Sequence, residues 1–324
     1  MKCILCGINE AYKDGICIEC LTSMKNVSYD KINITVCPKC GSIKINKRWY
    51  YNNPDDALFN YVSRMLEKKN NSIKKIYNYL KDDYINVNIV FDDGIEKNVS
   101  IPMDVSRESC PVCNKLTGSY YEAIIQLRTF SRDRSHLIDT ARDNIINDIK
   151  RYNVNDPNSF VSKVVNLKEG IDIYLGKRDD AAKVIKNLDS KYFIDTKVTK
   201  SLAGKKDGKD VFRYTHLIRI FDLEPGSIIF SRGRNYMVKS VEPGNINIMD
   251  LSLKKDLTMD EKTFFSSNFD LIRRSEKRRF IVISNNGSET ELMDEKNFNI
   301  VTIKGIIKSD SIDLYNYNDE YYII

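Results

Sequence analysis

The sequence contains no cysteine after position 113, although eight cysteines occur up to and including that position in a chain of 324 residues. Only two histidines and one tryptophan are present, so a metal site built mainly from imidazole is excluded. No apolar run approaches the roughly 18 residues of a membrane-spanning helix, and the start MKCILCG has no apolar signal segment. We therefore expect a cytoplasmic protein that does not contact a membrane.

Sequence patterns of common enzymes are also missing. There is no nucleophile elbow, no dinucleotide-binding fingerprint and no pair of carboxylates beside a base. The stretch from Gly170 to Arg178 resembles a phosphate-binding loop, but it is one residue too long and has arginine where serine or threonine must hold Mg²⁺. We therefore predict a non-catalytic protein without a small-molecule substrate.

All eight cysteines fall into Cys-x-x-Cys pairs, which are Cys3/Cys6, Cys17/Cys20, Cys37/Cys40 and Cys110/Cys113. Two cysteines three apart on a tight turn supply half of a tetrahedral zinc shell. Gly7, Gly41 and Asn114 each follow the second cysteine of a pair and tolerate the positive φ that such turns often need. The pattern predicts two four-cysteine sites and two Zn²⁺ ions per chain, with a structural role because four thiolates leave no position for water.

Two other interpretations of the cysteines are disfavoured. Disulfides need an oxidising compartment, and a redox dithiol is one pair beside a βαβ pattern, not four pairs. The grouping of the pairs stays open. The sequential arrangement joins Cys3/Cys6 with Cys17/Cys20, and we prefer it, but a cross-brace that joins Cys3/Cys6 with Cys37/Cys40 is the alternative.

The formal charge of +6 counts every thiol as neutral. Each filled four-cysteine site carries a charge of −2, so two such sites lower the net charge to about +2. Net charge alone is therefore weak support for a nucleic-acid partner, and the local clusters of basic residues matter more.

The fold class expected is α+β multidomain: an N-terminal double zinc-ribbon region, a small middle α/β domain and a small C-terminal β-barrel of the SH3 or OB type. The expected boundaries are 1–154, 155–221 and 222–324. In the first domain, helices are predicted from Pro54 to Lys69 and after Ser72, where Ile73, Ile76, Tyr77 and Leu80 share one helical face. A hairpin is predicted at 86–105, around the turn Asp92-Asp93-Gly94.

Basic residues beside aromatic residues or at exposed turns are candidates for RNA contact. The loop 203–209 is expected to be exposed and mobile, and Arg232 and Arg234 flank Gly233 at a predicted hairpin tip. Trp49 fits equally well as a residue packed against a zinc ribbon. The candidate RNA-binding residues are Arg48, Trp49, Arg128, Arg132, Arg134, Lys205, Lys206, Lys209, Arg213, Arg219, Arg232 and Arg234.

Several short stretches of the sequence indicate a resemblance to a known family. They are Cys37-Pro-Lys-Cys40-Gly41 with Trp49, Cys110-Pro-Val-Cys113 followed by GSYYEAIIQLR from Gly118 to Arg128, Gly170 to Tyr174, Ser201 to Gly204, and Arg213 to Arg219. With these residues the chain resembles the 60S ribosomal export adaptor family, historically called nonsense-mediated decay protein three, and most of all its archaeal branch. The resemblance covers essentially the whole chain.

The resemblance implies a zinc-binding N-terminal region, a middle domain similar to eukaryotic ribosomal protein twenty-two and a barrel similar to translation factor five-A. It implies a monomer that binds rRNA and ribosomal proteins on the intersubunit face of the large ribosomal subunit during maturation. The sequence ends just after the expected barrel, so we expect no nuclear-export tail. The alternative function is a zinc-ribbon RNA-binding factor in transcription or RNA decay.

Overall fold

The computed structural model describes residues 1–81, 84–132, 136–206 and 208–324. It divides into two compact units, Met1–Gly118 and Ser119–Ile324. The α+β multidomain class is confirmed, with curled β-sheets in the C-terminal part. No helix among the described residues is long and apolar enough to cross a membrane.

The first unit is built on one six-stranded sheet with the order β3-β2-β1-β6-β5-β4. Leu58, Val62 and Leu66 of α2 pack with the inward residues of β1, β5 and β6. The elements are α1 (Ile18–Met24), β1 (Ile32–Val36), β2 (Ile43–Ile45), β3 (Arg48–Tyr50), α2 (Pro54–Lys69), β4 (Ile73–Lys81), β5 (Tyr84–Phe91), β6 (Glu96–Arg107) and α3 (Pro111–Thr117).

The predicted helix after Ser72 is wrong, because these residues form β4 and pair with β5. A register shift between Ile73 and Lys75 lets Ile73 and Ile76 both pack against the core, although they are three residues apart. A β-bulge thus gives Ile73 and Ile76 the three-residue spacing that resembles a helical period. The predicted hairpin is present as β5 and β6, and Gly94 in its turn has φ +81°.

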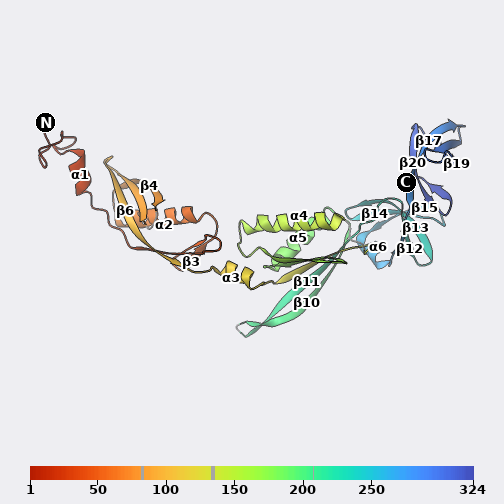
Figure 1. Ribbon diagram of the computed structural model, residues 1–324, viewed down its shortest axis with the longest axis horizontal. Helices are drawn as coiled ribbons and strands as arrows, with labels where there is room; N and C mark the ends of the chain where they lie inside the picture. The colour runs from red at the N-terminus through yellow and green to blue at the C-terminus, as the bar shows by residue number, and fades with distance from the viewer. Residues whose placement is uncertain (82–83, 133–135, 207) are drawn as a thin grey trace. The chain divides into compact units, whose positions relative to one another are not determined.

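The second unit begins with a five-stranded sheet in the order β10-β11-β7-β9-β8. Helices α4 and α5 lie on one face of it (Figure 1), where Ile138, Ile145 and Val184 join the core. The elements are β7 (Ala123–Thr129), α4 (His136–Asn153), β8 (Val161–Leu167), β9 (Gly170–Leu175), α5 (Asp179–Asp189), β10 (Ile194–Lys206) and β11 (Lys209–Ile220).

The domain boundary expected at residue 154 does not agree with this arrangement of strands and helices. Strand β7 lies between β11 and β9 in the sheet of the second unit, and α4 packs on that sheet. Residues 119–154 therefore belong with the α/β region, because a strand cannot leave the centre of a sheet without exposing its backbone N–H and C=O groups.

Residues from Ser227 onward form two five-stranded sheets, ordered β15-β14-β13-β12-β16 and β19-β18-β17-β20-β21. Phe264 and Phe269 of the first of these regions stack with each other, and Phe264 meets Phe193 and Phe221 from the end of the α/β region. The elements are β12 (Ser227–Ser231), β13 (Arg234–Glu242), β14 (Asn245–Asp250), β15 (Lys255–Asp260), α6 (Glu261–Ser266), β16 (Asp270–Arg274), β17 (Glu276–Asn285), β18 (Glu289–Asp294), β19 (Ile300–Lys304), β20 (Ser311–Tyr317) and β21 (Glu320–Tyr322).

Candidate metal centres and nucleic-acid interface

The first cysteine group lies in residues 1–24. Two isolated bridges, Lys2↔Glu10 and Lys13↔Ile16, fold the chain back so that its first turn meets the start of α1. Cys17 is the N-cap of α1 and Cys20 lies in its first turn. The Sγ atoms of Cys3, Cys6, Cys17 and Cys20 all lie within 4.8 Å of one another.

The second group is assembled by two parallel strands. β1 and β6 run side by side from Ile32↔Met103 to Val36↔Arg107, so they end together. Cys37 follows β1 directly, and Cys110 follows β6 as the N-cap of α3. Cys37, Cys40, Cys110 and Cys113 place their Sγ atoms within 4.8 Å of one another. The two groups correspond to the sequential arrangement of the four pairs.

Both groups fit a tetrahedral metal ion with sulfur ligands. Zn–S bonds of about 2.3 Å in a tetrahedron place neighbouring sulfur atoms about 3.8 Å apart. The Sγ atoms of Cys6 and Cys17 are 3.7 Å apart, and so are those of Cys40 and Cys110. Gly7 and Gly41 adopt the expected positive φ of +67° and +75°. Asn114 does not, because α3 continues through it.

Backbone N–H groups in each group favour a thiolate. The N–H of Cys17 lies 3.2 Å from Cys3 Sγ, and the N–H of Cys110 lies 3.4 Å from Cys37 Sγ. The backbone N–H groups of Cys6 and Cys17 lower the pKa of Cys3 to about 6. Burial opposes ionisation of Cys37, but the N–H groups of Cys110, Lys39 and Cys40 lower its pKa to about 6.

Backbone N–H groups of Asn9 and Ile8 also lower the pKa of Cys6, but in each group two thiols resist ionisation without a metal ion. The Cys17 side chain and burial raise the pKa of Cys20 to about 12. Burial and the Cys40 side chain raise the pKa of Cys113. Four thiolates at this distance repel one another, so a divalent cation is the group that lets all four ionise together.

Trp49 covers the second cysteine group. It packs with Tyr51 and Val112 against Cys37, Cys110 and Cys113, and its ring centroid is 6.4 Å from that of Tyr51. Burial, with the charges of Cys110 and Cys40, raises the pKa of Tyr51 to about 12. Trp49 therefore has a packing role, which is one of the two interpretations that the sequence allowed.

Four candidate RNA-binding arginines pair with aspartates, and the most exposed of these pairs is Arg132 with Asp270, at 4.0 Å. Arg128 lies 2.9 Å from Asp172 and also donates to the carbonyl of Leu127. Arg219 pairs with Asp195 at 3.5 Å, and Arg234 pairs with the buried Asp250 at 3.1 Å. In the Arg128 pair both partners are largely buried, so this ion pair stabilises the sheet.

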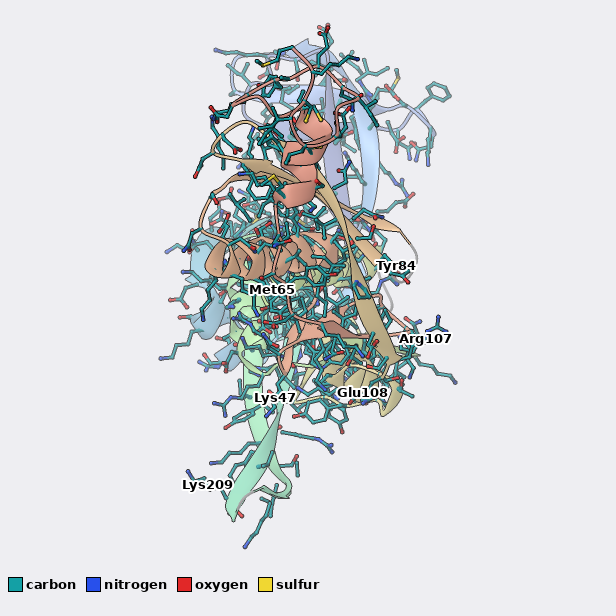
Figure 2. The ribbon with its side chains drawn as sticks, turned by 90° about the vertical axis from the view of Figure 1, so that its left-hand side faces the viewer. Lys47, Met65, Tyr84, Arg107, Glu108 and Lys209 are labelled. Atoms are coloured by element: carbon teal, nitrogen blue, oxygen red, sulfur yellow. The ribbon has the colours of Figure 1, made fainter. Side chains whose placement is uncertain are left out.

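The candidates at the surface are dispersed. Arg48, Arg132, Lys205, Lys209 and Arg232 are exposed. The expected loop 203–209 is instead the end of the long β10–β11 hairpin, whose strands pair as far as Lys206↔Lys209 because Gly208 (φ +75°) allows a tight turn. Lys209 lies at its end (Figure 2). Arg134 and the side chain of Lys206 lie outside the described residues.

Sequence reasoning missed two aromatic residues beside cations in the second unit. Lys163 Nζ lies 4.2 Å from the ring centroid of Tyr174, and the guanidinium of Arg213 lies 4.2 Å from that of Tyr121. The two rings meet edge to face, with centroids 4.8 Å apart. The available signal was the alternation in β9 and β11, which places Tyr174 and Arg213 on the sheet face opposite the core.

Family comparisons cover most of the chain. The model described as NMD3, N-terminal domain, matches residues 3–118, and the model described as NMD3, second domain, matches residues 120–220. No curated protein matches the chain.

Among solved structures, eukaryotic translation initiation factor 5A from Methanococcus jannaschii aligns over 32% of this chain and 88% of its own, with 14% identity and a TM-score of 0.21. That similarity is too low to carry a structural argument. The two family matches together span about two thirds of the residues, and on this evidence the chain belongs to the NMD3 family.

Proposed function

We propose that this protein is a non-enzymatic maturation factor of the large ribosomal subunit. It binds the intersubunit face as a monomer, through rRNA and ribosomal proteins. The observation that carries the proposal is the match to both NMD3 domains over residues 3–220, since that family has a ribosome-related adaptor role. Residues 222–324 act as a further, barrel-type binding domain.

Two Zn²⁺ ions complete the cysteine groups in this proposal. Each group supplies four sulfur ligands, which fill the tetrahedral shell and leave no position for a reacting water. When bound, zinc supplies a crosslink between chain segments. The cysteines then fix the first turn against α1 and the end of β1 against α3, so the metal shapes the surface that meets the ribosome.

Exposed basic residues supply the phosphate contacts. Lys205 and Lys209 lie at the end of a two-stranded hairpin, Arg232 occupies a turn with φ +49°, and Arg48 lies at the edge strand β3. Three of these positions lie on paired strands and Arg232 lies on a turn, and contacts from them to phosphates depend on charge and place rather than on base sequence.

Co-sedimentation of the full chain with purified large and small subunits, at low and at high salt, tests the proposal. We expect binding to large subunits at low salt, and log affinity should fall against log salt by about 0.7–0.9 for each phosphate neutralised. Retention on small subunits instead, or no binding at low salt, would overturn the proposal.

A pair of variants sharpens this experiment. Lys205→Gln with Lys209→Gln should weaken large-subunit binding and reduce the salt slope by about 2 if each lysine neutralises one phosphate. The matched control is Lys186→Gln with Lys191→Gln, which removes the same charge from positions in and after α5. Equal loss in both variants would mean that net charge, not the hairpin, determines binding.

A further inference from the structure

The sheet of the second unit has one face that its helices do not cover. Alternate residues of β7, β9 and β11 face α4 and α5, among them Ile125, Ile173 and Ile218. The intervening residues point to the opposite face, and none of them joins the hydrophobic clusters of the described residues. We call this opposite side the open face. It is five strands wide, or about 20 Å at the usual strand spacing.

Aromatic side chains and cations alternate on the open face. Tyr174 of β9 lies beside Tyr121, which closely precedes β7, and the two rings are held edge to face. Lys163 and Arg213 lie against these rings from the neighbouring strands β8 and β11. Both tyrosines are half-buried, so they are held in place and still reachable from solvent.

The charge of the open face is positive. Its strands carry the cations Lys163, Arg128, Arg213, Arg219 and Lys197, and the acids Asp172 and Asp195. Both acids already pair with arginines of the same face. Within the described residues, Lys163 and Arg213 pair with tyrosine rings and with no carboxylate, so their charges remain available to an anionic ligand.

A cavity of about 470 Å³ continues the open face at its other end. Arg128, Leu217 and Arg219 of the sheet form part of its lining, and Phe265 and Asn268 at the end of α6 form another part. The lining also includes Arg132 and the acids Glu169 and Asp270, so the cavity combines arginines and carboxylates with phenylalanine rings. Its volume is large enough for one nucleotide.

We propose that the open face binds a single-stranded RNA segment, in which bases replace Lys163 and Arg213 on the rings of Tyr174 and Tyr121 and the two displaced cations bind the phosphates. The adjacent cavity receives the end of that segment. Open sheets with exposed aromatic residues stack two or three bases in this way, because every base offers an aromatic face. A duplex keeps its bases inside and cannot use the rings. The inference rests on the proposed function for its source of RNA, which is rRNA.

The test uses the full chain and a short single-stranded RNA that carries 2-aminopurine, whose fluorescence is quenched by stacking. Tyr174→Leu and Tyr121→Leu should each weaken binding by about 5- to 100-fold for a lost stacking contact and abolish the quenching. Tyr174→Phe keeps the ring and should retain both. Lys163→Gln should leave the quenching intact and lower the salt slope by about one.

Tyr77→Leu is the matched control, because Tyr77 in β4 is 51% exposed and also lies near a lysine, with Lys75 Nζ 5.2 Å from its ring. It should leave the affinity unchanged. Equal affinity of the wild-type chain for duplex and single-stranded RNA would overturn the inference, and so would unchanged binding by Tyr174→Leu. Tight binding of a polyglutamate peptide that displaces the RNA would assign the face to an acidic protein segment instead.

Subunit binding separates this inference from the proposed function. If Tyr121→Leu with Tyr174→Leu still co-sediments normally and still binds single-stranded RNA, the open face is not the site, although the maturation role stands. If the wild-type chain does not co-sediment with large subunits but binds single-stranded RNA through these tyrosines, the maturation role fails and the open-face site stands.

Discussion

The two cysteine groups have the same ligands but different surroundings. The first group lies in residues 1–24, and none of these residues belongs to a hydrophobic cluster of the described chain. Its apolar residues Ile4, Leu5 and Ile8 are 69%, 57% and 71% exposed. The second is joined to a six-stranded sheet and covered by Trp49 and Tyr51. A bound metal ion would thus replace a core in the first group and complete one in the second.

Removal of the metal ions should produce the largest difference in folding between the two cysteine groups. Apparent zinc-binding free energies in small zinc modules are about 10–16 kcal/mol, so residues 1–24 should unfold in a strong chelator while the sheet from β1 to β6 stays folded. Hydrogen exchange followed by mass spectrometry measures this directly. Protected amides at 1–24 in the metal-free chain would show that a core other than the metal holds the first group.

Replacement of a single cysteine should remove the metal ion of its own group and leave the other ion in place. Cys17→Ser and Cys110→Ser should each leave one zinc ion per chain in native mass spectrometry, since each removes a ligand from a different group. Cys17→Ser should release protection only in 1–24, and Cys110→Ser only near Cys37 and α3. Loss of protection at 1–24 in Cys110→Ser would require that the two groups fold as one.

Zinc binding should release protons in both groups at pH 7. In the first, the N–H of Cys20 favours the Cys17 thiolate, but burial and neighbouring thiols raise its pKa, and the pKa of Cys20 is about 12. In the second, burial raises the pKa of both Cys110 and Cys113. At least two thiols per group must therefore lose protons.

Calorimetry in buffers of different ionisation enthalpy counts these protons. We expect at least two per ion, and affinity that falls as pH falls, because protonated thiols do not bind zinc. Proton release near zero at pH 7 would contradict the raised pKa values.

The aromatic cover should matter only in the second group. Trp49→Leu removes part of the packing over Cys37 and Cys110, so the sheet unit should lose about 1–3 kcal/mol of unfolding free energy in denaturant titrations. The control is Tyr12→Leu beside the first group, where the side chain is 62% exposed and the change should stay within about 0.5 kcal/mol. A larger loss of unfolding free energy in Tyr12→Leu than in Trp49→Leu would show that aromatic packing does not distinguish the two groups.

The smallest effect is expected from the ion pair next to the second group. Lys44 and Glu108 are 3.2 Å apart, with side chains 30% and 60% exposed. Glu108→Gln should therefore cost less than about 1 kcal/mol, and the difference should vanish in high salt. A larger cost would mean that this pair, rather than the strands β1 and β6, positions the second group.

The sequence predicted the features that depend on local chemistry. The spacing of the cysteines indicated two groups of four, and Asp93-Gly94 indicated the hairpin that carries Cys110 back toward Cys37. Features that depend on distant pairing were harder. The bulge after Ile73 imitates a helical period, and β7 lies in a sheet whose other strands begin only at Val161.

The open face was also beyond the reach of sequence alone. Tyr121 and Arg213 are distant in the chain, and their contact depends on the parallel pairing of β7 with β11. Arg128 was predicted to contact RNA, but the alternation that brings it beside Asp172 could not be used before the register of β7 and β9 was known.

Ultraviolet crosslinking of the full, zinc-bound chain to purified large subunits tests the central claim most directly, because it reports both the partner and the protein surface. We predict crosslinks to large-subunit rRNA from the second unit, including peptides that contain Tyr174 or Lys209, and their loss when excess salt releases the chain. A map without large-subunit rRNA would contradict the account and favour a factor that acts on other RNA.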